Sequence, residues 1–353
     1  MWTEAELLGA VMLVALVLYA LFAGADFGGG VWHLLARGPR KEAQQELIHH
    51  AIAPIWEANH VWLILVVVVL FTGFPRAFAA LGTRFHSPLT ALLVAVVLRG
   101  AAFVFRSAPG IPRRHVRRWG RTFALASVAA PPLLGMTVAA IASGAPAPAR
   151  LTVTGPWTSP FALATGAFTL ALFAYLAAVY LCVEATGELR EDFRRRALAS
   201  GVLCGALALA AFLFSAKGAP LVRAGLSQRP WSWAFHGATA AAALLALGSL
   251  LTRRFLQARA CAAVQVALVV LGWGASQHPW LIVPDLALAS ASAPRATQRL
   301  LLYTLAVGAV VLFPSLRLLY RIFKPLPGPP ARATTPDPTP AAGRSDRSTR
   351  TSG

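Results

Sequence analysis

Hydrophobic residues occur along this chain in long runs that are separated by short polar segments. Windows of about 20 mainly apolar residues, the length that crosses a bilayer as a helix, occur nine times. They lie near residues 5–34, 52–74, 88–106, 121–143, 160–184, 197–216, 232–252, 258–276 and 299–323. The short alternating segments of a membrane β-barrel are not apparent in the sequence. The pattern therefore predicts an all-α polytopic membrane protein with about nine transmembrane helices.

The composition supports the membrane class. Of the 353 residues, 57% are hydrophobic and only 13% are charged, and the mean hydropathy is +0.62. Soluble proteins carry about 25% charged residues. The three cysteines, Cys182, Cys204 and Cys261, all fall in predicted spans. Their spacing indicates neither a disulfide framework nor a paired metal site, so we expect small buried residues.

The net charge of +19 could suggest nucleic acid binding, but the positions of the basic residues indicate a membrane topology instead. With nine spans, the two termini lie on opposite sides. One side then collects 23 of the 32 basic residues and the other collects eight, while Arg99 lies inside a span. The positive-inside rule predicts an external N-terminus and a cytoplasmic C-terminus. Attraction to anionic lipid is a secondary consequence.

The segments outside the spans carry further expectations. Residues 325–353 are rich in Pro, Thr, Ser and Arg, so we expect a disordered cytoplasmic tail after a transmembrane domain at 1–324. The segment 36–50 is expected to be a basic loop, and 188–192 a solvated loop. We expect segment 277–299 to pack on the membrane face. Trp32 is expected to be an interfacial anchor, and His236 to be structural.

An acid, an amide and an imidazole open the second predicted span. The stretch IAPIWEANHVWL at 52–63 places Glu57, Asn59 and His60 between two tryptophans, and an apolar run follows. An ionisable residue facing hydrocarbon at mid-depth costs roughly 2.5–3.5 kcal/mol. Glu57 lies about 9 Å above the start of the span and shares a helix face with His60. Retaining a carboxyl group here suggests a functional role.

Two more ionisable residues lie inside predicted spans. Asp26 follows Gly24 and precedes Gly28, a small-xxx-small pair that allows another helix to approach closely. Arg99 lies well inside the third span and requires a carboxylate or carbonyl partner. The predicted topology places Asp26, Glu57 and Arg99 in the cytoplasmic half. Two compatible interpretations follow: a structural ion-pair network, and a polar path that opens to the cytoplasm.

Other functional classes remain open at this point. His60, or His33 together with His60, could ligate haem, although a membrane histidine is more often hydrogen-bonded within its bundle. Buried Asp, Glu and Arg side chains also occur in secondary transporters. Transporters, however, have two similar halves with broken helices, and here only Pro131-Pro132 suggests a break. The sequence indicates no nucleophile with its base, P-loop or metal site.

Several motifs carry a resemblance to a known family. The segments GADFGGGVW at 24–32 and IAPIWEANHVWLI at 52–64 resemble subunit II of cytochrome bd-type quinol oxidases in wording and in spacing. Phe74-Pro75 and the Leu98-Arg99-Gly100 triplet followed by Phe105-Arg106 are similar to that family as well. The resemblance is good over roughly the first 140 residues and is mainly one of hydropathy in spans five to eight.

The resemblance implies two four-helix bundles plus a peripheral helix in a bacterial cytoplasmic membrane. It implies a larger, homologous subunit I that holds haem b and haem d, oxidises quinol and reduces oxygen to water. Subunit II ligates no haem in most members, supports its partner and helps to take up cytoplasmic protons. The sequence leaves open which quinone is used, whether a small single-helix subunit joins, and whether a quinone or lipid fills a structural site in this chain.

The resemblance also assigns roles to the three intramembrane ionisable residues. Glu57 occupies the position of the family's proton-path carboxylate, and Asp26 and Arg99 match its other polar membrane residues. In one respect the chain departs from the pattern. Family members often carry an acid two residues before the second arginine of the third helix, where this chain has Val104. A proton relay copied whole from the family is therefore not expected.

Overall fold

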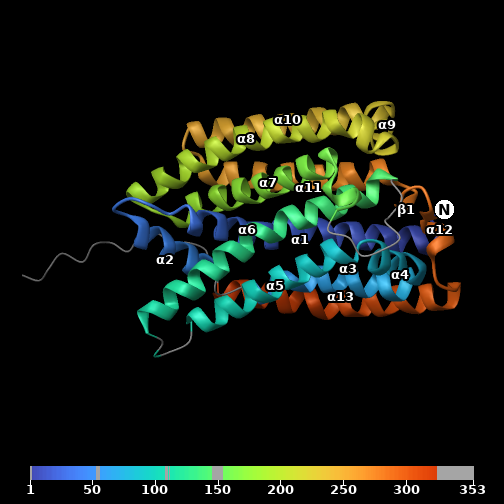
Figure 1. Cartoon of the computed structure of the whole chain (residues 1–353), viewed down its shortest axis with the longest axis horizontal. Helices are drawn as coiled ribbons and strands as arrows, with labels where there is room; N and C mark the ends of the chain where they lie inside the picture. The colour runs from blue at the N-terminus through green and yellow to red at the C-terminus, as the bar shows by residue number, and fades with distance from the viewer. Residues whose placement is uncertain (1, 53–55, 108–109, 111, 145–153, 324–353) are drawn as a thin grey trace, which may run out of the picture.

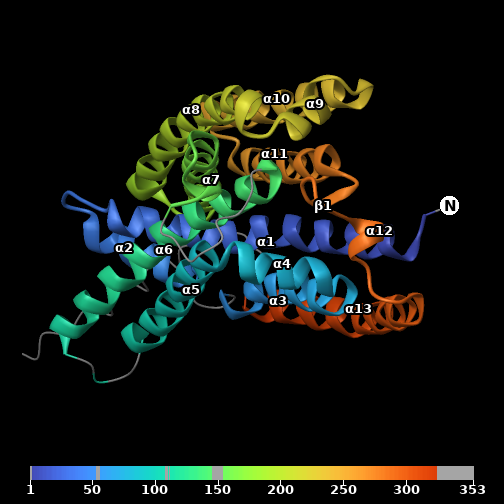
Figure 2. The same cartoon turned by 45° about the vertical axis from the view of Figure 1, so that its right-hand side comes forward.

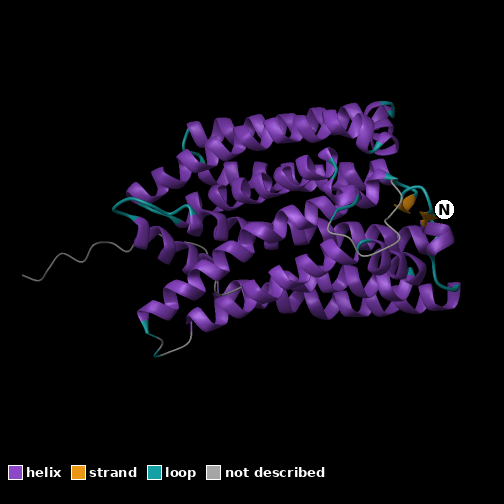
Figure 3. Cartoon of the chain, in the orientation of Figure 1, coloured by secondary structure: helices purple, strands orange, loops and turns teal. Residues whose placement is uncertain are grey.

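The chain folds into helices that run along one common direction (Figures 1 and 3). A computed structural model describes residues 2–52, 56–107, 110, 112–144 and 154–323. The helices are α1 Glu4–Leu34, α2 Lys41–Ile52, α3 Trp56–Gly73, α4 Pro75–Arg84, α5 His86–Ser107, α6 Arg113–Ser143, α7 Pro160–Glu184, α8 Gly187–Gly218, α9 Pro220–Ser227, α10 Pro230–Leu251, α11 Phe255–Gln277, α12 Leu288–Ala291 and α13 Arg295–Phe323. A 3₁₀ turn, Pro156–Thr158, and two strands, β1 Trp280–Ile282 and β2 Leu286–Ala287, complete the described elements. The predicted tail at 325–353 lies outside the described residues.

Eight of the described helices are long and apolar enough to cross a membrane. A ninth span arises if the bent pair Asn59–Gly73 and Pro75–Arg84, which meet at 114°, counts as one. The bend falls where Pro75 begins α4, because proline has no N–H to continue the hydrogen bonding of α3. The prediction of an all-α polytopic membrane protein is confirmed.

The helices form two groups of four that pack against each other (Figures 1 and 2). One group contains α1, α3, α5 and α6, and the other contains α7, α8, α10 and α11. The groups meet where α1 and α6 pack on α7, and α13 packs on the outside against α1 and α3. This arrangement agrees with the expected two four-helix groups plus one peripheral helix.

The contact between α1 and α7 is close because glycines face α7. A Cβ atom at Gly28 would lie 1.9 Å from the Phe173 carbonyl oxygen, and one at Gly24 would lie 2.8 Å from the Phe173 ring. The predicted close approach at this pair is therefore confirmed. Trp32 lies on the same contact and donates its indole N–H to the Ala174 carbonyl at 2.7 Å. The expectation of an interfacial anchor was wrong, because Trp32 faces the neighbouring helix and is buried.

Adding one methyl group at this contact should loosen the bundle. Gly28→Ala places a Cβ against a backbone carbonyl that cannot rotate away, and overpacking of this kind costs about 1–3 kcal/mol. Gly205→Ala is the matched control, because a Cβ there has open space and a helical alanine is favoured over glycine by up to ~1 kcal/mol. Thermal unfolding of the purified protein should show a lower midpoint for Gly28→Ala alone. Equal midpoints for Gly28→Ala and the unmodified chain would contradict the contact.

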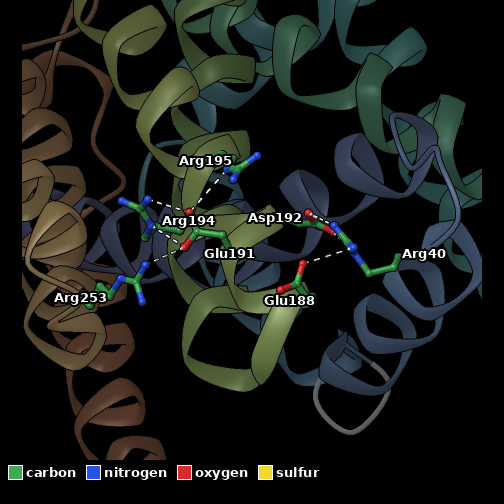
Figure 4. A network of polar contacts seen from close by, with 7 residues as sticks. All are labelled: Arg40, Glu188, Glu191, Asp192, Arg194, Arg195 and Arg253. Atoms are coloured by element: carbon green, nitrogen blue, oxygen red, sulfur yellow. Dashed lines mark hydrogen bonds and ion pairs between the residues drawn. The ribbon is translucent and has the colours of Figure 1, made fainter.

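An ion-pair network joins segments that are far apart in the sequence at one end of the bundle (Figure 4). Arg40, which precedes α2, contacts Asp192 at 2.6 Å and Glu188 at 3.4 Å. Its hydrogen bond to Asp192 raises the pKa of the Arg40 guanidinium. On the other side of α8, Glu191 contacts Arg194 at 2.7 Å and Arg253 at 3.8 Å.

This network corrects two expectations about loops. Residues 188–192 are not a solvated loop but the first turns of α8, which begins ten residues before the predicted span. Likewise, most of the predicted loop at 36–50 is helix α2. Both segments are helical although polar, because they pack on one another: Gln44 of α2 is buried and donates to Asp192 at 2.9 Å.

A small hairpin covers the opposite end of the bundle, near the N-terminus (Figure 1). The strands β1 and β2 pair antiparallel, with Trp280 opposite Ala287. Backbone bonds tie the segment to the helix ends: Val283 N–H donates to the Ile141 carbonyl at 3.2 Å, and Ala293 N–H to the Gly73 carbonyl at 2.8 Å. The strands were not predicted, because they are only two and three residues long.

The basic loops gather at one end of the structure, as expected from the count of basic residues on each side of the membrane. Which side of the membrane this end faces in the cell stays a prediction. Arg114, at the start of α6, lies at this basic end, and Arg229, before α10, lies at the other; both are exposed. In intact cells, an impermeant thiol reagent should label Arg229→Cys and leave Arg114→Cys unlabelled. The background should lack the native cysteines, of which only Cys261 is partly accessible. The opposite labelling pattern would reverse the orientation.

Candidate functional site: a buried polar cluster

Asp26 is held in the middle of the helix bundle by a side chain from α3. The Asn59 amide of α3 donates a hydrogen bond to Oδ2 of Asp26 on α1. Only 4% of Asp26 and none of Asn59 is exposed. Because the pairing residues lie on two predicted spans, the contact fixes α3 against α1 at this depth.

Arg99 on α5 completes the cluster. It is 1% exposed, and the charge of Asp26 acts on it electrostatically. Its Nε donates to the Ser127 hydroxyl of α6 at 3.2 Å, and its guanidinium lies over the rings of Phe27 and Phe123, at 4.8 Å and 5.1 Å from their centroids. Ionic, hydrogen-bond and cation–π interactions therefore hold one buried cation.

The cluster lies toward the basic end of the bundle. Asp26 is eight residues from the end of α1, and Arg99 is eight residues from the end of α5. Both helices end on that side (Figure 1), so each residue lies about 12 Å from its helix end. The shared depth that the topology predicted for these two residues is present in the structure.

Glu57 lies in the first turn of α3, two residues before Asn59. The rise of a helix places its backbone about 3 Å along the axis from that of Asn59. Its side chain lies outside the described part of the structure. The structure thus brings Asp26 and Arg99 into one cluster and places the backbone of Glu57 beside it.

Sequence reasoning left three members of this cluster unassigned. Asn59 was noted only as part of the opening stretch, yet it is the partner of Asp26. Ser127 binds Arg99 and faces Gly30, where a Cβ would lie 2.4 Å from its hydroxyl oxygen. Tyr19 is 2% exposed, and both Asp26 and Arg99 act on it electrostatically. A polar residue opposite a helical glycine was the one signal that could have identified Ser127.

The two candidate haem ligands lie in different surroundings. His60 lies 6.0 Å, ring to ring, from both Tyr19 and Phe27. His33 packs on Phe123, and its Nε2 accepts a hydrogen bond from Arg106 at 3.0 Å. A nitrogen that accepts from a guanidinium cannot also bind iron. In this arrangement Nε2 of His33 is not free to bind a haem iron, and the described residues contain no group of three or more His, Cys, Asp or Glu side chains placed to hold a metal.

A second, half-buried polar group lies between this cluster and the basic end. His49 of α2 contacts the Phe103 ring at 5.2 Å. Burial lowers the pKa of His49, and the nearby Arg106 cation lowers it further, while Glu46 opposes the shift. At neutral pH, His49 is therefore an uncharged imidazole beside the Arg106 cation.

An apolar cavity of about 590 Å³ lies between α1, α6, α7, α8, α10 and α11. Aromatic side chains, including Tyr19, Phe212, Trp233 and Trp273, line it. His236 also lines it and binds the Leu226 carbonyl at 2.9 Å through Nε2, which agrees with the structural role expected for it. The volume and lining suit an apolar molecule of ligand size.

Comparisons with known proteins agree with this architecture. Residues 5–323 match the model of the family described as cytochrome bd terminal oxidase subunit II. The fold is similar to that of bd oxidase from Geobacillus thermodenitrificans, with a TM-score of 0.76 and 21% identity over 91% of this chain and 99% of that chain.

Two curated relatives align with this chain, one over nearly its full length and the other over about half of it. A putative cytochrome bd menaquinol oxidase subunit II of Bacillus subtilis (strain 168) is 24% identical over 91% of this chain and 96% of its own length. Cytochrome bd-I ubiquinol oxidase subunit 2 of Escherichia coli (strain K12) is 28% identical over 55% of this chain and 53% of its own length. Because the family match extends across nearly all of the described helices, this chain belongs to the cytochrome bd terminal oxidase subunit II family.

Proposed function

We propose that this chain supports a haem-bearing subunit I in a quinol oxidase and helps to bring cytoplasmic protons toward its oxygen site. The observation that supports the proposal is the buried cluster of Asp26, Asn59 and Arg99, since ionisable side chains at membrane depth are costly and are retained for function. Family membership favours this function over that of a secondary transporter, the alternative from the sequence.

The contacts suggest different roles for the two carboxyl groups. Asp26 accepts a hydrogen bond from Asn59 and interacts electrostatically with Arg99. A carboxylate held in this way acts as a fixed counter-ion. Glu57, in the first turn of α3, is then the group we expect to take up and release a proton.

Proton movement past this cluster requires polar atoms that can bind water. Within the described residues, Arg99 Nη2, Asn59 Oδ1 and His60 Nδ1 are buried and make no hydrogen bond. Buried polar atoms are normally paired, often with ordered water. Each of these three atoms could bind a water molecule, which supports a water-mediated path past the cluster.

The structure also bears on the departure at Val104. This side chain is 52% exposed on α5, whereas Arg99 on the same helix is buried. An acid at position 104 would therefore lie on the outer surface of this chain and not inside the cluster. We infer that its absence affects the entry to a path, or a contact with subunit I, more than the cluster itself.

The cofactors of the proposed complex belong to the partner. We propose that subunit I holds haem b and haem d; in this chain, Nε2 of His33 already accepts a hydrogen bond from Arg106. The relatives are named as menaquinol and ubiquinol oxidases, so the substrate is proposed only as a quinol. The apolar cavity is the place where a quinone or lipid could act as a structural filler. A small single-helix subunit could join the complex as a third chain.

Expression with and without subunit I tests the proposal. The chain expressed alone should purify without haem absorbance, whereas co-expression should give a coloured complex that oxidises quinol and consumes oxygen. A stoichiometric reduced-haem spectrum from the isolated chain would instead support a cytochrome that uses His33 and His60. A colourless chain that does not bind subunit I and moves a solute would support the transporter.

A further inference from the structure

Four arginines form one exposed face at the start of α6. Arg114, Arg117, Arg118 and Arg121 are all exposed, and their spacing of three or four residues places them on the same side of the helix. We refer to these four residues as the arginine stripe. They occupy the first nine residues of a helix that is 31 residues long.

No acidic side chain in the described part of the chain pairs with the stripe. The sequence contains no Asp or Glu between Glu57 and Glu184. Within the described residues, the stripe makes no ion pair, although Arg40, Arg194 and Arg253 at the same end of the bundle all do (Figure 4). The described part of the chain therefore supplies no counter-charge for the stripe.

The helix terminus adds to this positive charge. Residue Pro112 precedes α6 and provides no side-chain cap, and the first turn contains no acidic residue. Unpaired N–H groups and the helix dipole both favour an anion at such an end. The stripe and the N-terminus of α6 thus both favour a negatively charged ligand.

The length of α6 places the stripe beyond the hydrocarbon core, at the level of the lipid headgroups. A helix of 31 residues is about 46 Å long, whereas the hydrocarbon core is about 30 Å thick, so α6 extends beyond it. The face of the stripe continues into Leu125, which is 60% exposed. On another face of α6, turned toward α5, Trp119 stacks on the half-exposed Phe105 with 4.9 Å between the ring centroids, as is usual for aromatic residues at the membrane interface. In Figures 1 and 2, this end of α6 extends away from α2 and the centre of the bundle.

We propose that the arginine stripe binds the headgroups of anionic phospholipids in the leaflet at the basic end of the bundle. One guanidinium group can bind two oxygens of the same phosphate, and four such groups over about two helical turns can hold more than one phosphate. The exposed Leu125 would then lie against the acyl chains. An acidic surface of subunit I is the competing occupant, and the continuity of the stripe with lipid-exposed residues favours lipid.

Native mass spectrometry of the purified oxidase complex tests the proposal. The complex is incubated with equal amounts of phosphatidylglycerol and phosphatidylcholine, and the retained lipids are counted. The unmodified complex should retain phosphatidylglycerol preferentially. Replacing all four arginines with glutamine should remove at least one retained phosphatidylglycerol and weaken its binding by about fivefold for each charge lost. Replacement by lysine should preserve most of the preference, because the charge remains.

Matched variants distinguish lipid binding at the stripe from nonspecific attraction of anionic lipid to other basic residues. Lys217→Gln with Arg229→Gln removes two exposed charges from the opposite end and should leave the preference unchanged. Equal retention of both lipids by the unmodified complex, or the same phosphatidylglycerol retention in the glutamine variant, would overturn the proposal. Loss of subunit I from the glutamine variant, with no lipid preference in the unmodified complex, would assign the stripe to the partner instead.

Discussion

An oxidase whose subunit II carries Asp26→Asn is expected to assemble poorly and to unfold at a lower temperature. Asparagine keeps the size of the side chain and can still accept the hydrogen bond from Asn59. The charge that acts on Arg99 is lost, and Arg99 is only 1% exposed. Leaving a buried charge without its compensating charge costs roughly 3–5 kcal/mol. Complex yield and the thermal unfolding midpoint measure the effect.

A second substitution distinguishes a structural pair from a proton path. Asp26→Asn combined with Arg99→Met removes both charges, and replacing a whole buried pair with neutral groups is often tolerated. Assembly should therefore recover in the double variant, while quinol oxidase turnover should stay low if the pair also organises the path. Asp285→Asn is the control: it breaks the exposed pair with Arg84 and should cost at most about 1 kcal/mol. Normal stability of Asp26→Asn alone would show that Arg99 is compensated elsewhere.

Glu57→Gln is expected to leave assembly intact and to abolish most turnover. Glutamine keeps the size and the hydrogen-bonding capacity of the side chain but cannot release a proton. Loss of a positioned proton carrier typically lowers a rate by about 10²–10⁴-fold. Glu57→Asp should retain part of the activity, because it still titrates on a shorter side chain. Haem content and oxygen consumption, measured on the same preparation, separate assembly from catalysis.

The outcome for Glu57 also tests its sequence-based alternative, a structural pair with Arg99. In that case Glu57→Gln would lower haem content and yield, as Asp26→Asn does. Glu42→Gln, on the exposed surface of α2 at the same end of the bundle, should change neither quantity. Full turnover in a fully assembled Glu57→Gln oxidase would remove Glu57 from the mechanism and leave water or other polar groups to carry the protons.

The sequence by itself determined the membrane class, the order of the long helices and the grouping of basic loops at one end. These features follow from local quantities: the length of an apolar run and the number of arginines in the connection after it. The close contact at Gly24 and Gly28 was also predictable, because small residues one turn apart permit close approach whatever the partner helix is. Their positions inside predicted spans identified Asp26, Glu57 and Arg99 as candidate site residues, and the family motifs assigned roles to them.

Only the tertiary structure decided which groups meet. Helix α2 and the first turns of α8 are polar, so hydropathy windows missed them. Contacts with Asp192 stabilise both segments: Gln44 of α2 donates a hydrogen bond to it, and Arg40, just before α2, forms an ion pair with it. Asn59 and Ser127 gave no periodic signal, since a single hydrogen bond to a distant residue leaves no local pattern. Trp32 is buried for the same reason: its partner is the Ala174 carbonyl, 142 positions away. Partners of buried polar groups are set by which helices pack together, and that information lies in the three-dimensional arrangement of the helices.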